Sequence, residues 1–161
     1  MESHDIKKTA LEFLNAPDRL TAVIGSSATD GNTHAATVYY YVDNSFNFYF
    51  LTANNTQKYR NLTENPNAAI VIGFGPSYTT VQGQGTILLL KKSSEEELEA
   101  IAHIKKRLQD HNDETWPIFQ LDEYESGSIA VFKLIPQTLG LLNLEKDNQL
   151  VVTDEEILPL V

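Results

Sequence analysis

The sequence predicts a β-rich α+β domain built from six to seven antiparallel strands and three helices. Stretches of strand length recur between turn-forming Gly, Pro, Asn and Asp residues, and two longer stretches carry apolar residues at helical spacing instead. A chain of 161 residues buries about 68 to 70% of its unfolded surface, so residues 1–161 suffice for one domain with one core. The expected strands are residues 20–26, 33–43, 46–52, 68–73, 79–90, 129–135 and 138–144.

The first element is an amphipathic helix over residues 3–15. Ile6, Ala10 and Leu14 recur at a spacing of four, which places them on one helical face. Pro17 disfavours helical backbone in the residue before it, so the helix ends there. We expect this helix to pack on the sheet.

The next three strands follow one another through short turns. Asp30-Gly31 is a strong hairpin signal and joins the first two strands. In the third strand Phe46, Phe48 and Phe50 alternate with other residues, and a period of two puts all three on one face. That face is expected to belong to the core.

A short helix over residues 56–62, capped by an Asn or Thr, follows the third strand and stops before Pro66. The run from Ala68 to Gly73 is then continuously apolar. Such a run is typical of a strand buried on both faces.

The fifth strand carries Gly83 and Gly85 two residues apart, on one face. Glycines so placed indicate either a sharp bend or the close approach of another backbone or ligand, and the sequence leaves both open. Two closing strands are expected on either side of Pro136, followed by an acidic tail with an apolar end.

A second long helix is predicted over residues 93–112. Ser94 and Glu97 form a capping-box pattern at its start, with acidic residues in the first turn and basic residues near the end. This charge pattern has a structural explanation, so we assign it no function. The expected apolar stripe consists of Leu98, Ile101, Ala102 and Leu108.

The passage from the third strand into the short helix is the best candidate site. Thr52 and Thr56 offer hydroxyls, the helix start offers unpaired amides, and Lys58 offers an ammonium, which together suit a phosphate. Lys58 and Asn61 are three apart and share a face, whereas Arg60 leaves the helix on another face. The alternative is that Lys58 and Arg60 only solvate a surface helix.

These residues resemble a known family. The segment HAATVYYYVD, followed by Leu51-Thr52 and then Thr56-Gln57-Lys58, is similar to the FMN-binding core of the pyridoxamine 5'-phosphate oxidase-like split β-barrels, in the branch of general stress proteins and flavin reductases. The resemblance implies that these five residues hold the FMN phosphate. The family has an arginine where this chain has Gln57, which donates a hydrogen bond but carries no charge.

The resemblance also implies a homodimer and a place for the flavin ring. The ring would contact Thr37, Val38 and Tyr39, largely through main-chain groups, although three consecutive tyrosines from Tyr39 also suit an ordinary half-buried strand. Trp116 is a candidate to reach the flavin of a dimer, with packing as the alternative. The chain lacks the Arg-Leu-x-Pro ending of true pyridoxamine-phosphate oxidases, so we do not expect vitamin B6 oxidation.

Composition and motif content exclude several kinds of binding partner and catalytic site. The net charge of −10 argues against nucleic acid and anionic membranes as partners, and no apolar run reaches 18 residues. The absence of cysteine excludes thiolate chemistry and fits a cytoplasmic protein. The four histidines lack metal-ligand spacing, and GxSxG, P-loop and GxGxxG motifs are absent. No catalytic side chain and no metal ligand is therefore expected.

Three hypotheses follow. The first is an FMN-dependent oxidoreductase that exchanges electrons with a small-molecule donor or acceptor, the flavin doing the redox chemistry. The second is a split barrel that binds another ligand, such as haem or a deazaflavin. The third is a dimeric interaction module without a cofactor.

Overall fold

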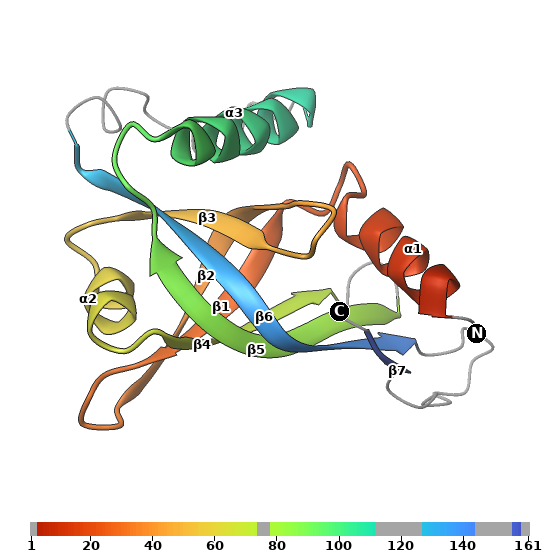
Figure 1. Cartoon of the computed structure of the whole chain (residues 1–161), viewed down its shortest axis with the longest axis horizontal. Coiled ribbons are helices and arrows are strands. Elements are labelled where there is room, and N and C mark those ends of the chain that lie inside the picture. The colour runs from red at the N-terminus through yellow and green to blue at the C-terminus, as the bar shows by residue number, and fades with distance from the viewer. Residues whose placement is uncertain (1–2, 74–77, 112–126, 144–155, 159–161) are drawn as a thin grey trace.

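Six antiparallel strands form a closed barrel in the computed structural model, which describes residues 3–73, 78–111, 127–143 and 156–158 (Figure 1). The sheet order is β3-β2-β1-β4-β5-β6-β7, and a further pairing of β3 with β6 closes the barrel. This confirms the predicted β-rich α+β class. The strands are β1 (Thr21–Ser27), β2 (Thr33–Val42), β3 (Phe48–Ala53), β4 (Asn67–Gly73), β5 (Thr79–Leu89), β6 (Ile129–Asn143) and β7 (Glu156–Ile157).

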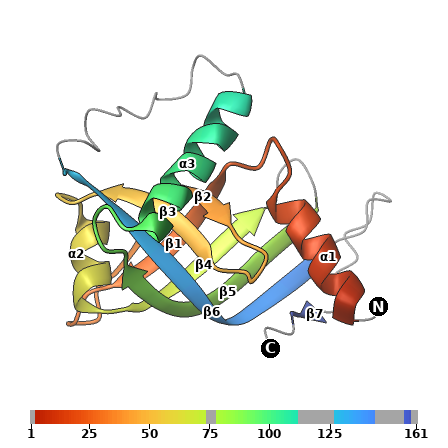
Figure 2. The same cartoon turned by 45° about the horizontal axis from the view of Figure 1, so that its top comes forward.

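Three helices surround the barrel, as predicted. Helix α1 (Ser3–Leu14) and helix α2 (Gln57–Glu64) lie at opposite ends, and both contribute apolar side chains to the main core. Helix α3 (Glu95–Asp110) lies outside the barrel, across β3, as Figure 2 shows. Among the described residues, no helix is long and apolar enough to cross a membrane.

Strand β3 is buried on both faces. The predicted core residues Phe46, Phe48 and Phe50 are all at most 3% exposed and belong to the main cluster inside the barrel. On the opposite face, Tyr49 and Leu51 join a second cluster beneath α3. The strand therefore links the barrel interior to the layer under α3.

Strand β4 differs from its prediction. Ala68, Ile70 and Ile72 are buried, but Val71 on the other face is 41% exposed. The expectation of burial on both faces was wrong because no helix of the described residues covers the outer face of β4, in contrast to that of β3. Val71 instead pairs with the equally exposed Val23 of β1, so the outer wall carries an uncovered apolar strip.

The two glycines of β5 allow a close approach of β6. A Cβ on Gly83 would lie 2.1 Å from the Thr138 carbonyl oxygen, and a Cβ on Gly85 would lie 2.1 Å from that of Ile135. The strand register shifts between Gln84 and Gly85, which marks a bulge. The sequence left open a sharp bend or the close approach of another backbone, and the structure shows both at these glycines. The approaching backbone is that of β6 in the same chain.

The closing segment is one strand. Pro136, expected to separate two strands, instead pairs with Gly85 at the bulge. Proline is tolerated at a bulge because the regular hydrogen-bond pattern is interrupted there, so its missing amide is not needed. The expected acidic tail also contributes a strand, since Glu156–Ile157 pairs with β6 and Leu158 is buried. Trp116 lies outside the described residues.

The buried face of α3 is rotated from the predicted stripe. Ile101 is buried as predicted, but Leu98 is 48% exposed and Ala102 is exposed, while Ala100 and Ile104 are buried instead. The predicted capping role of Ser94 is confirmed, because its hydroxyl accepts the Glu97 amide at 3.2 Å. The Glu97 carboxylate is also buried, and its partner is Lys92, at 3.4 Å.

Candidate functional site

Two threonine hydroxyls meet where β3 passes into α2. Thr52 is 5% exposed, and its Oγ1 lies 3.1 Å from that of Thr56. Thr56 is the N-cap of α2: its Oγ1 accepts the Tyr59 amide at 3.1 Å and donates to the Ala53 carbonyl oxygen at 2.9 Å. The amides of Gln57 and Lys58 precede the first intrahelical hydrogen bonds and stay at the open end of the helix. This end therefore presents donors to an anion.

Lys58 adds a cation to the same helical turn. Its side chain is half-buried, and this burial lowers the pKa of its ammonium. In the described part of the chain, no carboxylate lies within ion-pair distance of it. A partly desolvated ammonium without a counter-charge favours binding of an external anion.

The side-chain amide of Gln57 is held by two neighbours on α2. Its Nε2 donates to Asn61 Oδ1 at 2.7 Å, and its Oε1 accepts from Arg60 at 2.8 Å. Asn61, expected to share a ligand-facing surface with Lys58, is 2% exposed and donates to Ser26 Oγ at 3.3 Å. Arg60 was expected to point elsewhere, but its guanidinium turns back toward the first turn of α2.

The strands beside α2 diverge. Strand β2 pairs with β3 only from Tyr40 to Val42, while β3 continues along β6 as far as Ala53. Helix α2 packs against β1, β2 and β3 at this split. The edge of β2 between Thr33 and Tyr39 thus has no strand neighbour on the side of β3 within the described residues.

The predicted ring segment lies on this edge of β2. Thr37 is exposed on the outer face, Val38 is buried in the core, and Tyr39 is half-buried, which raises the pKa of its hydroxyl. Contact with a flavin would involve mainly their main-chain groups. The Leu51 side chain packs beneath α3, away from the buried face that holds Thr52, so it too offers only its backbone.

The other tyrosines have structural partners. The Tyr40 hydroxyl donates to the Leu14 carbonyl oxygen at 2.5 Å, and the Tyr41 ring stacks on His103 of α3 with centroids 4.2 Å apart. His103 is exposed, as expected for a surface histidine. These rings hold α1 and α3 to the barrel, which supports the ordinary packing interpretation for both residues.

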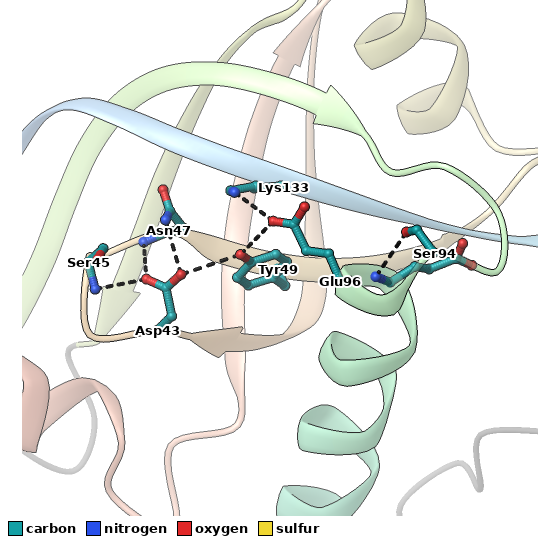
Figure 3. Close-up of polar contacts among 8 residues, drawn as sticks. Asp43, Ser45, Asn47, Tyr49, Ser94, Glu96 and Lys133 are labelled. Carbon is teal, nitrogen blue, oxygen red and sulfur yellow. Dashed lines mark hydrogen bonds and ion pairs between the residues drawn. The ribbon is translucent and has the colours of Figure 1, made fainter.

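A polar network that the sequence did not predict fixes the start of α3 to the barrel (Figure 3). The Tyr49 hydroxyl donates to Glu96 at 2.9 Å, and Lys133 donates to the same carboxylate oxygen at 2.6 Å. The hydrogen bond from Lys133, followed by that from Tyr49, lowers the pKa of Glu96. Burial, followed by the hydrogen bond to Glu96, raises the pKa of Tyr49. The network joins residues 47 and 37 positions apart, so no local motif could indicate it.

A hollow of about 600 Å³ on the outer wall was also not predicted. His34 lies in its lining, and the Nδ1 atom of His34 is buried without a hydrogen-bond partner. The hollow is lined by residues of five strands, β1, β2, β4, β5 and β6, which explains why local sequence patterns did not reveal it. The side chains that supply polar groups to the lining are Ser26, Ser27, Thr33, His34, Asn67, Gln84 and Gln137. No group of three potential metal ligands occurs among the described residues.

A model of the family described as pyridoxamine 5'-phosphate oxidase matches residues 6–142, which include the whole β3–α2 junction. The chain belongs to the pyridoxamine 5'-phosphate oxidase family. No curated protein matches it by sequence. The family assignment confirms the resemblance on which the split-barrel expectation rested.

Solved structures extend the likeness in fold. General Stress Protein 26 from Bacillus anthracis str. Sterne matches with a TM-score of 0.59 and 16% identity, over 84% of this chain and 92% of its own. HutZ, the haem storage protein from Vibrio cholerae, matches with a TM-score of 0.62 and 14% identity, over 82% and 91%. A haem-binding protein from Mycobacterium smegmatis matches with a TM-score of 0.61 and 15% identity, over 94% and 57%. The family fold is thus found in proteins with different named roles.

Proposed function

We propose that this chain is an FMN-binding flavoprotein that transfers electrons between small molecules through the bound flavin. The observation that carries the proposal is the half-buried Lys58 ammonium, which has no anionic partner among the described residues and stands on the first turn of α2. The two open amides at the start of α2 add donors suited to a phosphate, and they lie beside the paired Thr52 and Thr56 hydroxyls.

Bound FMN would supply the redox chemistry itself, through its isoalloxazine ring. The chain's own residues would bind the FMN and orient its ring. The β3–α2 junction anchors the phosphate, and the edge of β2 from Thr37 to Tyr39 offers main-chain donors and acceptors beside the split. No side chain of this site is needed as an acid or base.

The proposed working form is a homodimer. Val23 and Val71 form an exposed apolar pair on the outer wall, 42% and 41% exposed, and Thr37 lies beside them on β2. Covering this wall with a second copy would bury apolar surface next to the segment assigned to the ring. The face of β5 that carries Gly83 and Gly85 has no room for a second copy, because β6 of the same chain fills that space.

The test is a titration of the purified protein with FMN and with riboflavin, followed by flavin fluorescence. Riboflavin carries the same ring without the phosphate. We expect FMN to bind at least about tenfold more tightly, the value of one charge-assisted hydrogen bond. Equal affinities for the two flavins, or no binding of either, would refute a phosphate site at this junction.

Haem is the second candidate. His34 supports it, because its buried Nδ1 has no hydrogen-bond partner and it lines the 600 Å³ hollow. Two proteins of similar fold are named for haem. A Soret band that appears on adding haemin, and is lost in His34→Ala, would favour haem over FMN.

A further inference from the structure

Arg60 and Gln57 form a fixed unit on the surface of α2. Arg60 Nη2 donates to Gln57 Oε1 at 2.8 Å, and Gln57 Nε2 donates to Asn61 Oδ1 at 2.7 Å. Asn61 is buried and donates to Ser26 of β1. The chain of hydrogen bonds therefore anchors an exposed guanidinium to the barrel through three side chains.

The direction of this unit matters for the phosphate site. Side chains of a helix lean toward its N-terminus, so a long residue in the second turn can reach the first. Arg60 does so, since its guanidinium meets the side chain of the first helical residue, Gln57. The guanidinium is thus held beside the side chain of the first helical residue, although Arg60 and Lys58 leave the helix on different faces.

Gln57 offers an anion less than Arg60 does. Its Oε1 accepts from Arg60 and one of its two Nε2 protons is donated to Asn61, which leaves a single neutral donor. Arg60, by contrast, has five N–H donors, and the described structure uses one of them in a hydrogen bond. A guanidinium with free donors suits phosphate oxygens, which it can bind through two parallel hydrogen bonds.

We propose that Arg60 supplies the second positive charge for the phosphate group, and that Gln57 is a positioning residue that holds the guanidinium at the first turn. This deepens the proposed function and rests on it. It also explains how a site with neutral Gln57 retains two cations for a dianionic ligand.

The experiment compares FMN and riboflavin affinities in wild type, Arg60→Met, Gln57→Ala and Lys106→Met. Arg60→Met should lower FMN affinity about three- to tenfold, the modest effect of an exposed charge, and leave riboflavin affinity within about twofold. Gln57→Ala should lose part of the same selectivity. Lys106 is 74% exposed on α3, so Lys106→Met removes one charge away from α2 and should change neither affinity.

A double-mutant cycle gives the decisive readout. Gln57→Arg introduces a guanidinium at the first turn and removes the acceptor that holds Arg60. In that background Arg60→Met should cost less than about twofold in FMN affinity, so the two changes are not additive.

The outcomes separate this inference from the proposed function. If wild type prefers FMN over riboflavin and Arg60→Met retains the full preference, the role of Arg60 is refuted while the phosphate site stands. If wild type binds FMN and riboflavin equally well, both the phosphate site and the role of Arg60 are refuted. An equal loss from Arg60→Met in the wild-type and Gln57→Arg backgrounds would refute the positioning role of Gln57.

Discussion

Replacement of Lys58 by methionine is the most direct test of the phosphate site. Lys58→Met keeps the aliphatic stem and the helix propensity but deletes the ammonium. A charge-assisted hydrogen bond contributes about 1.5 to 3 kcal/mol, so FMN affinity should fall by roughly ten- to a hundredfold, more than for the exposed Arg60. Riboflavin affinity should not change, because riboflavin lacks the phosphate.

The stability of the free protein should stay the same or rise slightly in Lys58→Met. Burial places the pKa of Lys58 in the folded protein below its unfolded value. Keeping the group charged therefore costs stability near neutral pH, and this cost disappears as the pH rises past the unfolded-state pKa. FMN affinity of the wild type should correspondingly weaken in alkaline solution, as Lys58 loses its proton.

Fluorescence titrations across pH and thermal unfolding of the flavin-free protein measure both effects. The matched control is Lys8→Met, which removes one exposed charge from α1, at the other end of the barrel. Equal FMN affinities for wild type and Lys58→Met, or an alkaline decline that persists in the variant, would mean that the phosphate lies elsewhere.

Three further predictions concern the barrel and its surfaces. Gly85→Ala should destabilise the fold by about 2 to 3 kcal/mol in chemical denaturation, because the new Cβ would overlap a β6 carbonyl oxygen. The control is Gly25→Ala, which should cost less than about 1 kcal/mol because the nearest atom to its Cβ is 3.5 Å away. Val71→Asp should convert a dimer seen by light scattering into a species of 18.0 kDa, and a wild type that already has this mass would contradict the proposed dimer. Lys133→Met should lower the free energy of unfolding by about 1 kcal/mol near neutral pH. The lowered pKa of Glu96 stabilises the fold only while Glu96 is ionised, so the stability difference between wild type and variant should shrink as acid protonates Glu96.

Local sequence patterns predicted the structure correctly where a feature depends on residues of a single segment. The alternation in β3 placed Phe48 and Phe50 in the core, and the cap of α2 follows from Thr56 alone. Burial of the second face was not predictable in this way. Leu51 is covered and Val71 is not, because α3 lies over β3 and no helix of the described chain lies over the outer face of β4.

The orientation of Arg60 illustrates a second limit. Helical spacing gives the direction in which a side chain leaves the helix, and by that criterion Arg60 is far from Lys58. The tip of a long side chain goes where its hydrogen bonds hold it, and here Gln57 is fixed by a buried Asn61. The position of the charge thus depends on a contact between α2 and β1 that is 35 residues apart in sequence.

The split between β2 and β3 explains why the parts of the site differ in how far the sequence reveals them. Closing the barrel requires β3 to leave β2 beyond Phe50 and follow β6, so the edge of β2 loses its neighbour where α2 enters. The phosphate residues lie on one continuous turn of chain, and their spacing alone suggests an anion site. The ring segment from Thr37 to Tyr39 gains its open edge only from the strand register, which local sequence does not encode. The two halves of the proposed FMN site are therefore products of different levels of structure, a helix cap and the closure of a barrel.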